Sequence, residues 1–317
     1  MASARRVGFS LRLRNAGRRW GFSRHHMIVP RRPRFGTRPK QETVTAPAEA
    51  PRPRQTWPVL ASSGSLEVRI AQSRREIEAA QKLRYHVFYE EMSAIPSPQM
   101  RAQRRDFDKY DDFCDHLLVV DRDTRGPDGL DAVVGTYRLL RGEVAALHGG
   151  YYTSSEFDLT SMLDGNPPGT RFLELGRSCV LKTYRTKTMT MQLLWRGIMA
   201  YVNRHSIDVM FGCGSLPGTD LDELALPLSY LHHFHPCPDN IRIRARSELC
   251  VDMNRMAKED IDPKAALRAL PPLIKGYVRS GTFIGEGAVV DRQFGTTDVL
   301  IYLPVSRLDA TFRRRFG

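Results

Sequence analysis

The chain has 317 residues, of which 41% are hydrophobic, with 14 Phe, 11 Tyr and 3 Trp. This composition excludes a wholly disordered chain and predicts one large domain or two small ones. The net charge is +13, but residues 1–60 hold 13 Arg and one Lys against two Glu, so nearly all of the excess lies there. The remainder is almost neutral, which argues against a large nucleic-acid-binding face on the domain.

Residues 1–65 are predicted to form a disordered basic extension, because Arg, Pro, Ser and Gly dominate them. Three interpretations stay open. The extension is a tether to anionic lipid, with about 1 kcal/mol from each basic side chain near the surface. It is an inert tail, or the true start is Met27. Its Arg-rich, acid-poor composition also resembles an organelle transit peptide.

The folded domain is predicted over residues 66–317. Alternating apolar residues indicate a strand at 66–70. Ser73 and Glu76 form a capping box for a helix that carries apolar side chains to Phe88. Two strands, 116–120 and 133–140, flank a turn and predict an antiparallel hairpin. Residues 142–170 are expected to be mostly loop, with one helical turn.

The second half of the domain alternates helices and strands. A strand is expected at 172–181, a helix at 190–203 and a short strand at 209–212. Further on, we expect helices at 221–232 and 263–279, the second interrupted at Pro271, and strands at 241–244, 288–290 and 299–302. Helices inserted into a mainly antiparallel sheet define an α+β fold.

No stretch approaches the roughly 20 apolar residues that span a bilayer, and no secretory signal is recognisable. The five cysteines are odd in number and include no CxxC pair, so reduced thiols are expected. His232, His233 and His235 have no Cys or acidic partner at ligand spacing, and no metal is expected there.

Glu174 and Arg177 place two charges in an otherwise apolar strand. Residues three apart point to opposite faces of a strand unless a bulge near Gly176 intervenes. One interpretation is a general base with an arginine that holds a carboxylate. The other is a structural ion pair.

Two loops carry further candidate residues. The segment from Val180 to Thr190 leads from a strand into a helix, where free backbone N–H groups can bind an anion; the alternative is ordinary surface. Asp108 and Asp111, in the acidic segment between 107 and 115, could bind a cationic acceptor or form a solvated acidic loop.

Taken in order along the chain, seven residues resemble the acyl-homoserine lactone synthases of the GNAT class. In that family the matching residues line the site between acyl carrier protein and acceptor. They are Arg84, Phe88, Asp108, Asp111, Arg138, Glu174 and Arg177.

Residues 66–304 resemble the bacterial L-ornithine N-alpha-acyltransferases of ornithine-lipid synthesis still more. The distinctive stretches are residues 83–92, 211–220, 226–233, 270–277 and 291–299. This resemblance implies a GNAT-like acyl-CoA N-acyltransferase fold, a twisted, mainly antiparallel sheet flanked by helices. It also implies transfer of a 3-hydroxy fatty acyl group from acyl carrier protein to the alpha-amine of L-ornithine.

The resemblance assigns roles to the candidate residues. Glu174 would be the base, and backbone N–H groups near Val180 and Leu181 would bind the thioester oxygen. Tyr230 would protonate the leaving thiolate, unless it is a core tyrosine. Asp108 or Asp111 would bind the second ammonium of ornithine, and Arg84, Arg138 or Arg177 its carboxylate.

The acyl donor is expected to arrive on the phosphopantetheine of acyl carrier protein, with no tightly bound cofactor. Residues expected to bind it are Val180, Leu181, Arg185, Lys187, Thr188 and Thr190. Thr188 and Thr190 stand where the GNAT pattern has glycines, which places close approach of a pyrophosphate in question. A phosphopantetheine has one phosphate and demands less.

Two alternatives remain at this point. One is an acyl-homoserine lactone synthase that uses S-adenosylmethionine. The other is a membrane- or nucleic-acid-binding module driven by the basic extension. For the acyltransferase we expect a cytoplasmic protein in peripheral contact with the anionic inner face of the membrane, without nucleic acid.

Overall fold

The computed structural model describes residues 58–127, 129–185, 188–308, 312 and 316. Most of the predicted basic extension lies outside these residues, and so does Lys187. The chain divides into two units, residues 1–51 and 52–317, and the second contains the fold described below. The fold begins before the predicted boundary at residue 66, because β1 (Ala61–Ser63) pairs antiparallel with β2 (Leu66–Ile70).

An 11-stranded sheet forms the framework, in the order β1-β2-β3-β4-β6-β7-β11-β10-β8-β5, with β9 also paired to β10. Among the described strands, only the β6–β7 and β8–β10 pairs are parallel. The remaining strands are β3 (Asp115–Arg125), β4 (Asp131–Arg141), β5 (Phe157–Asp158), β6 (Phe172–Val180), β7 (Val209–Pro217), β8 (Arg244–Ala245), β9 (Cys250–Val251), β10 (Phe283–Asp291) and β11 (Thr296–Pro304).

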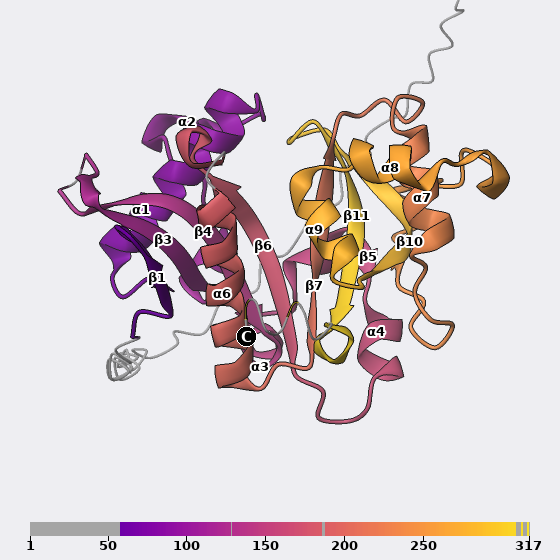
Figure 1. Ribbon diagram of the computed structural model, residues 1–317, viewed down its shortest axis with the longest axis horizontal. Helices are drawn as coiled ribbons and strands as arrows, with labels where there is room; N and C mark the ends of the chain where they lie inside the picture. Colours follow the sequence, from indigo (N-terminus) through magenta and orange to yellow (C-terminus); the bar gives the residue numbers. More distant parts are fainter. Residues whose placement is uncertain (1–57, 128, 186–187, 309–311, 313–315, 317) are drawn as a thin grey trace, which may run out of the picture. The chain divides into compact units, whose positions relative to one another are not determined.

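Helices cover the sheet (Figure 1). They are α1 (Arg74–Tyr85), α2 (Pro98–Gln103), α3 (Gly142–Leu147), α4 (Thr160–Gly165), α5 (Lys182–Arg185), α6 (Thr188–His205), α7 (Ala225–Phe234), α8 (Pro263–Ala269) and α9 (Pro272–Arg279). A π-helical segment, His86–Glu91, continues α1, and short 3-10 segments include Lys109–Asp112 and Tyr152–Ser155. None of the helices in the described ranges is long and apolar enough to cross a membrane.

Helix α6 packs on the first strands of the sheet, and Gly197 permits its close approach. A Cβ atom at Gly197 would lie 2.6 Å from Cγ2 of Val68 on β2. Leu193, Leu194 and Ile198 of the same helix are buried in the main core. The expected helical face at 190–203 is therefore confirmed, and it fixes the half of the sheet that carries β4 and β6.

Strands β6 and β7 part in the middle of the sheet. Their parallel register covers only Phe172–Glu174 against Val209–Phe211. Beyond Glu174, β6 stays paired with β4, and β7 stays paired with β11 (Figure 1). The sheet thus forks, and the edges of β6 and β7 that face each other are not hydrogen-bonded to one another in this register.

Most predicted elements are confirmed, and three differ. Residues 142–170 contain α3, the 3-10 segment Tyr152–Ser155, β5 and α4 rather than one helical turn. The helix expected from 221 begins at Ala225, because Asp220 holds the preceding residues in a turn. The strand expected at 241–244 is reduced to β8, because the Ile243 N–H bonds locally to the Ile241 carbonyl.

Candidate active site

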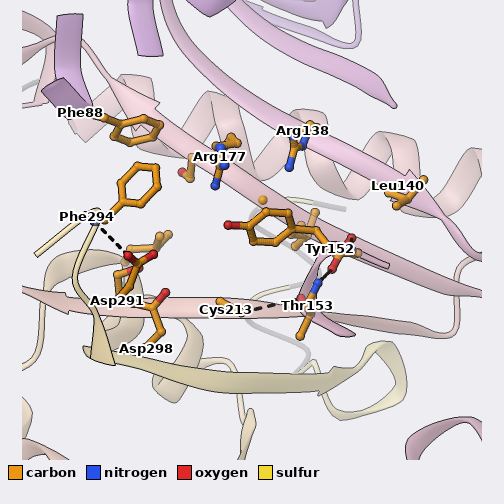
Figure 2. A pocket seen from close by; sticks show the side chains of 16 residues that line it. Phe88, Arg138, Leu140, Tyr152, Thr153, Arg177, Cys213, Asp291, Phe294 and Asp298 are labelled. Carbon is orange, nitrogen blue, oxygen red and sulfur yellow. Dashed lines mark hydrogen bonds between the residues drawn. The ribbon is translucent and has the colours of Figure 1, made fainter. Parts of the chain in front are cut away.

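A pocket lies at the fork between β6 and β7. It encloses about 130 Å³, close to the roughly 150 Å³ that accommodates a molecule of the size of benzene. Its lining comes from β4, β6, β7, the π-helical segment His86–Glu91, the 3-10 segment Tyr152–Ser155, α9 and the β10–β11 hairpin. Figure 2 shows these side chains. Four predicted site residues line it, namely Phe88, Arg138, Glu174 and Arg177.

A β-bulge in β6 brings Glu174 and Arg177 into the same pocket. Gly176 pairs with Arg138 and Cys179 pairs with Thr136, so one residue of β4 faces two residues of β6. Arg177 takes up the extra residue with a φ of 51°, in the left-handed region. The bulge considered near Gly176 is therefore present, and it removes the alternation that would have separated the two charges.

Glu174 is held as a buried carboxylate at the base of the pocket, with 5% of its surface exposed. Its Oε1 accepts a hydrogen bond from the Thr153 N–H at 2.6 Å, and its Oε2 accepts one from the Tyr152 N–H at 3.0 Å. Burial raises the pKa of Glu174 above its usual value, although the two backbone donors and Arg138 oppose the shift. A carboxylate whose pKa is raised toward neutrality is suited to accept a proton.

Two guanidinium groups form the cationic side of the pocket. Arg138 Nη1 lies 2.6 Å from Asp108 Oδ1, and Arg177 Nη2 lies 3.3 Å from Asp108 Oδ2. The Arg177 guanidinium lies 4.8 Å from the centre of the Tyr152 ring and 5.1 Å from that of Phe294. Both arginines are thereby held at the cavity by rings and by carboxylates, since Arg177 also lies 3.4 Å from Asp106 and Arg138 3.6 Å from Asp111.

Arg84 and Asp111, two of the alternatives predicted to contact the acceptor, belong to a buried network rather than to the pocket lining. Arg84 is fully buried. Its Nε lies 2.6 Å from Asp106 Oδ2, and its Nη2 lies 2.8 Å from Asp111 Oδ2. Neither Arg84 nor Asp111 lines the pocket, and the two side chains form ion pairs within this buried network instead. Asp108 likewise reaches the site only through the two arginines that it binds.

A second group of carboxylates forms the anionic side of the pocket. Asp291 and Asp298, at the ends of the β10–β11 hairpin, line the cavity opposite the arginines (Figure 2). Glu156 lies behind them, and one oxygen of each carboxylate is within 4.8 Å of the others. The sequence analysis assigned no role to these residues, although the stretch 291–299 was among the family's distinctive segments.

The predicted donor-binding loop is only partly available. The Leu181 N–H donates to the Val134 carbonyl at 2.8 Å, so it is not free to bind a thioester oxygen. Val180 is buried, and its carbonyl accepts from Arg185 Nε at 2.8 Å. Thr190 is fully buried within α6, which removes it from any contact with the donor. Arg185 pairs with Glu91 but stays partly exposed.

The side chains of Lys187 and Thr188, the other two residues predicted to bind the donor, lie outside the described structure. Thr188 is the first residue of α6, and the position of its side chain is outside the described structure. Lys187 lies outside the described residues altogether. Arg185 is therefore the one predicted donor contact that the described part of the chain leaves accessible.

Tyr230 is a core tyrosine, which corrects the role predicted from its place in the chain. It is 8% exposed and belongs to the main core, where it stacks with Phe234. It lines none of the cavities described for this chain. The second alternative considered for this residue is thus the one that the packing favours.

Two other tyrosines lie at the fork. A smaller cavity of about 40 Å³ adjoins the first, and Leu175–Ser178 line both. Tyr137 and Tyr277 line this second cavity, and their hydroxyl oxygens are 3.1 Å apart. The sequence analysis missed both residues, although Tyr277 closes the distinctive stretch 270–277.

The forked sheet and its pocket define an enzyme of the GNAT acyltransferase class. The family model of the acetyltransferase (GNAT) domain matches residues 83–196, which include Glu174 and both pocket arginines. This agreement confirms the predicted α+β fold, a mainly antiparallel sheet flanked by helices.

Curated relatives define the particular family. The chain is 51% identical to the L-ornithine N(alpha)-acyltransferase of Rhizobium meliloti (strain 1021), over 82% of this chain and 86% of that protein. The enzyme of the same name from Agrobacterium fabrum is 49% identical over 80% and 86%. That from Brucella abortus is 48% identical over 82% and 91%. The chain therefore belongs to the L-ornithine N(alpha)-acyltransferase family.

Proposed function

We propose that this enzyme transfers a 3-hydroxy fatty acyl group from acyl carrier protein to the alpha-amine of L-ornithine, giving lyso-ornithine lipid. The observation that carries the proposal is the position of Glu174 beside two inward-facing arginines in a pocket of amino-acid size. The names of the relatives support ornithine as the acceptor. Membership of this family also favours an enzyme over a binding module that depends on the basic extension.

The carboxylate of the acceptor binds at the arginine side of the pocket. Arg138 and Arg177 share Asp108, and they also lie 3.6 Å from Asp111 and 3.4 Å from Asp106, so carboxylates already offset much of their charge. The acceptor carboxylate can still accept paired hydrogen bonds from the guanidinium N–H groups on the cavity side. This contact fixes the alpha-carbon and places the alpha-amine next to Glu174.

Glu174 acts as the base that frees the amine. An ammonium group has no lone pair, so it must lose a proton before it attacks the thioester carbon. The nitrogen–carbon bond then forms, the carbon–sulfur bond breaks, the nitrogen gives its second proton to solvent, and the thiolate leaves on the phosphopantetheine. Since burial raises the pKa of Glu174, the carboxylate takes up this proton more readily than an exposed one.

The thioester carbonyl lies at the fork. Its oxygen gains negative charge during attack and needs hydrogen-bond donors. Because Leu181 is committed to β4, we assign this role to backbone N–H groups on the open edge of β6 near the bulge. A Cβ atom at Gly176 would meet nothing within 4 Å, so the backbone there is open to a ligand.

The leaving thiolate takes a proton from the tyrosine pair in this assignment. Tyr277 and Tyr137 lie in the cavity that adjoins the bulge, whereas Tyr230 is sequestered in the core. Burial raises the pKa of Tyr277, so its hydroxyl stays protonated and available as a donor. Arg185, at the end of α5, is placed to meet the phosphate of the carrier's arm.

The place of action that we propose is the cytoplasmic face of the membrane, where the lipid product is used. The 13 Arg and one Lys of residues 1–60 supply the attraction to anionic lipid. Flotation of the full chain with phosphatidylglycerol vesicles, with and without residues 1–57, tests this. We expect co-flotation that depends on the extension, and a full chain that stays at the bottom of the gradient would contradict it.

Acyl transfer by the full chain tests the proposed reaction. The chain would be given 3-hydroxyacyl carrier protein with L-ornithine, and in a parallel reaction with S-adenosylmethionine, and the products identified by mass. An ornithine amide with a free side-chain amine is the expected product. A lactone from S-adenosylmethionine would instead establish the signal-synthase alternative, and no amide with ornithine would overturn the proposal.

A further inference from the structure

The anionic side of the pocket has a fixed geometry. Asp291 Oδ1 accepts hydrogen bonds from the N–H groups of Gln293 and Phe294, at 2.8 and 3.0 Å. Asp298 Oδ1 accepts from the Thr296 hydroxyl at 2.9 Å. The Ser215 side chain also hydrogen-bonds the Asp298 carboxylate. The hairpin therefore presents two oriented carboxylates to the cavity rather than two freely rotating side chains.

No cation of the described structure forms a direct ion pair with these carboxylates, and Arg177 across the cavity opposes the rise in the pKa of Glu156 and Asp298 only weakly. Neither Asp291, Asp298 nor Glu156 has a Lys, Arg or His nitrogen within 4.0 Å among the residues described. Glu156 is 9% exposed, and the partner of its Oε2 is the weakly polar Cys213 thiol at 3.4 Å. Arg177, the cation across the cavity, is directed instead at Asp106 and Asp108. Three clustered, largely buried carboxylates without a counter-ion are costly unless a ligand supplies one.

The protonation behaviour of the cluster agrees with this excess of negative charge. Burial, with Asp298 next in effect, raises the pKa of Glu156 to about 7. Burial also raises the pKa of Asp298 to about 6, and Asp291 adds to the shift. Glu156 is thus partly protonated near neutral pH and Asp298 takes up a proton below about pH 6, and a bound cation would favour the ionised form of both.

The order of charges across the pocket matches one kind of ligand. The arginines lie on one side and Asp291 and Asp298 on the other side (Figure 2). Glu174, held by the Tyr152 and Thr153 N–H groups, lines the same pocket. An amino acid whose carboxylate binds the arginines, and whose alpha-amine meets Glu174, would direct its side chain toward the hairpin. A side chain that ends in an ammonium group would supply the missing counter-ion there.

We infer that Asp291 and Asp298, supported by Glu156, bind the side-chain ammonium of the acceptor and thereby select a basic amino acid. The inference rests on the proposed function. It assigns the contact with the side-chain ammonium to the β10–β11 hairpin instead of to Asp108 and Asp111, because Arg138 and Arg84 already pair with those two carboxylates. It also gives a role to the stretch 291–299, which the acyl-transfer chemistry alone leaves unexplained.

Competition between two acceptors tests the inference. L-Norvaline has the same three-carbon side chain as L-ornithine but no terminal amine. We expect the kcat/KM of the unmodified full chain to be on the order of a hundredfold higher for ornithine than for norvaline. Norvaline brings no ammonium group, so it leaves the buried carboxylates unpaired. Asp298→Asn and Asp291→Asn should each lose most of this preference through a higher KM for ornithine. Their rates with norvaline should be retained or increased.

Asp252→Asn is the matched control. Asp252 also accepts a backbone N–H, from Asn254 at 2.8 Å, but it is exposed and lines no described cavity. We expect its preference for ornithine to be unchanged. Thermal melting of all three variants identifies any that fail to fold.

A measurement on the unmodified chain requires no variant. The ratio of kcat/KM for the two acceptors cancels the protonation of the alpha-amine and of Glu174, which both substrates share. It should fall several-fold between pH 8 and pH 5 as the cluster takes up protons near pH 7 and 6. The groups that face the cluster, Cys213 from β7 and Arg177 from β6, keep their protons over this range.

The outcomes separate the inference from the proposed function. Unmodified chain that acylates neither amino acid would overturn the proposed reaction itself. The unmodified chain could instead acylate ornithine while both variants keep its preference for ornithine over norvaline and while this preference does not change with pH. That result would overturn only the inference. A preference that EDTA abolishes and Mg²⁺ restores would also overturn it, because the carboxylates would then hold a metal ion.

Discussion

Glu174→Gln is the substitution that most directly tests the proposed base. The change removes the group that takes the proton, and loss of a general base typically lowers the rate by about 10²- to 10⁴-fold. It also leaves the Tyr152 or the Thr153 N–H facing an amide N–H₂ in place of a carboxylate oxygen. An unpaired buried donor costs about 1–3 kcal/mol, and each kcal/mol lowers Tm by about 2–4 °C in a domain of this size.

The pH dependence of the rate separates these two effects. Without its base, the variant can use only acceptor molecules whose alpha-amine is already neutral. Its kcat/KM should therefore rise about tenfold for each pH unit, up to the pKa of the amine. The unmodified enzyme should level off at lower pH, once Glu174 is ionised. Because burial raises the pKa of Glu174, its ascending limb should lie above the pH expected for an exposed glutamate.

A matched control isolates the structural effect. Glu76 on α1 also accepts a backbone N–H, from Gln72 at 2.6 Å, far from the pocket. Glu76→Gln should lower Tm without changing the pH profile. The reasoning about Glu174 would be refuted by a Glu174→Gln variant that keeps the unmodified pH profile and loses less than about tenfold in kcat. Glu174 would then only hold the segment Tyr152–Ser155.

Three other predictions concern the walls of the site. Arg177→Lys removes the planar group between Tyr152 and Phe294 and should raise the acceptor KM about tenfold; steady-state kinetics with an unchanged KM would contradict this. Tyr277→Phe should slow acyl transfer at least tenfold in a single-turnover assay, whereas Tyr230→Phe should not; the reverse order would restore the role first assigned to Tyr230. For Asp298, burial raises the folded-state pKa from 3.8 to about 6. The stability that protonated Asp298 contributes below pH 4 is therefore lost as the pH rises through 6. The free energy of unfolding of Asp298→Asn, measured relative to that of the unmodified chain, should be higher at pH 8 than at pH 4 by up to roughly 3 kcal/mol. Denaturant unfolding at both pH values checks this, and an equal difference at both would contradict it.

Periodicity and caps identify most of the fold from sequence alone. Ser73 caps α1 and accepts the Glu76 N–H as the capping box predicts, and the alternation at 66–70 gives β2. These features are local, so the sequence window contains their cause. The alternation at 241–244 misleads, because Ile241 and Ile243 alternate in burial without pairing to a strand over most of that length.

The site is less accessible to sequence reasoning, because its chemistry depends on contacts between distant segments. Arg84 and Arg138 are the same residue type in the same family pattern. Arg84 is buried against two carboxylates, whereas Arg138 lines the pocket. Nothing local distinguishes them, nor does anything local show that Tyr230 is in the core while Tyr277 reaches the fork.

The carboxylates of the hairpin illustrate the same limit. Asp291 and Asp298 are seven positions apart, and they follow Glu174 by 117 and 124 residues. The pairing of β11 with β7 brings them to the same cavity. A signal was nevertheless present, since both aspartates flank Gly295, whose φ of 66° marks a turn. Two acids at the ends of a tight hairpin must lie close together.

The division of the pocket between two parts of the chain has an evolutionary consequence. The proposed base Glu174 and both pocket arginines belong to residues 83–196, the range that the acetyltransferase model matches, whereas Asp291 and Asp298 lie well beyond it. Mutation and selection can therefore alter the hairpin while the reactive half is conserved. An exchange of residues 291–298 is a single, short genetic event, and a lineage could acquire a new amino-acid acceptor through it without rebuilding its catalyst.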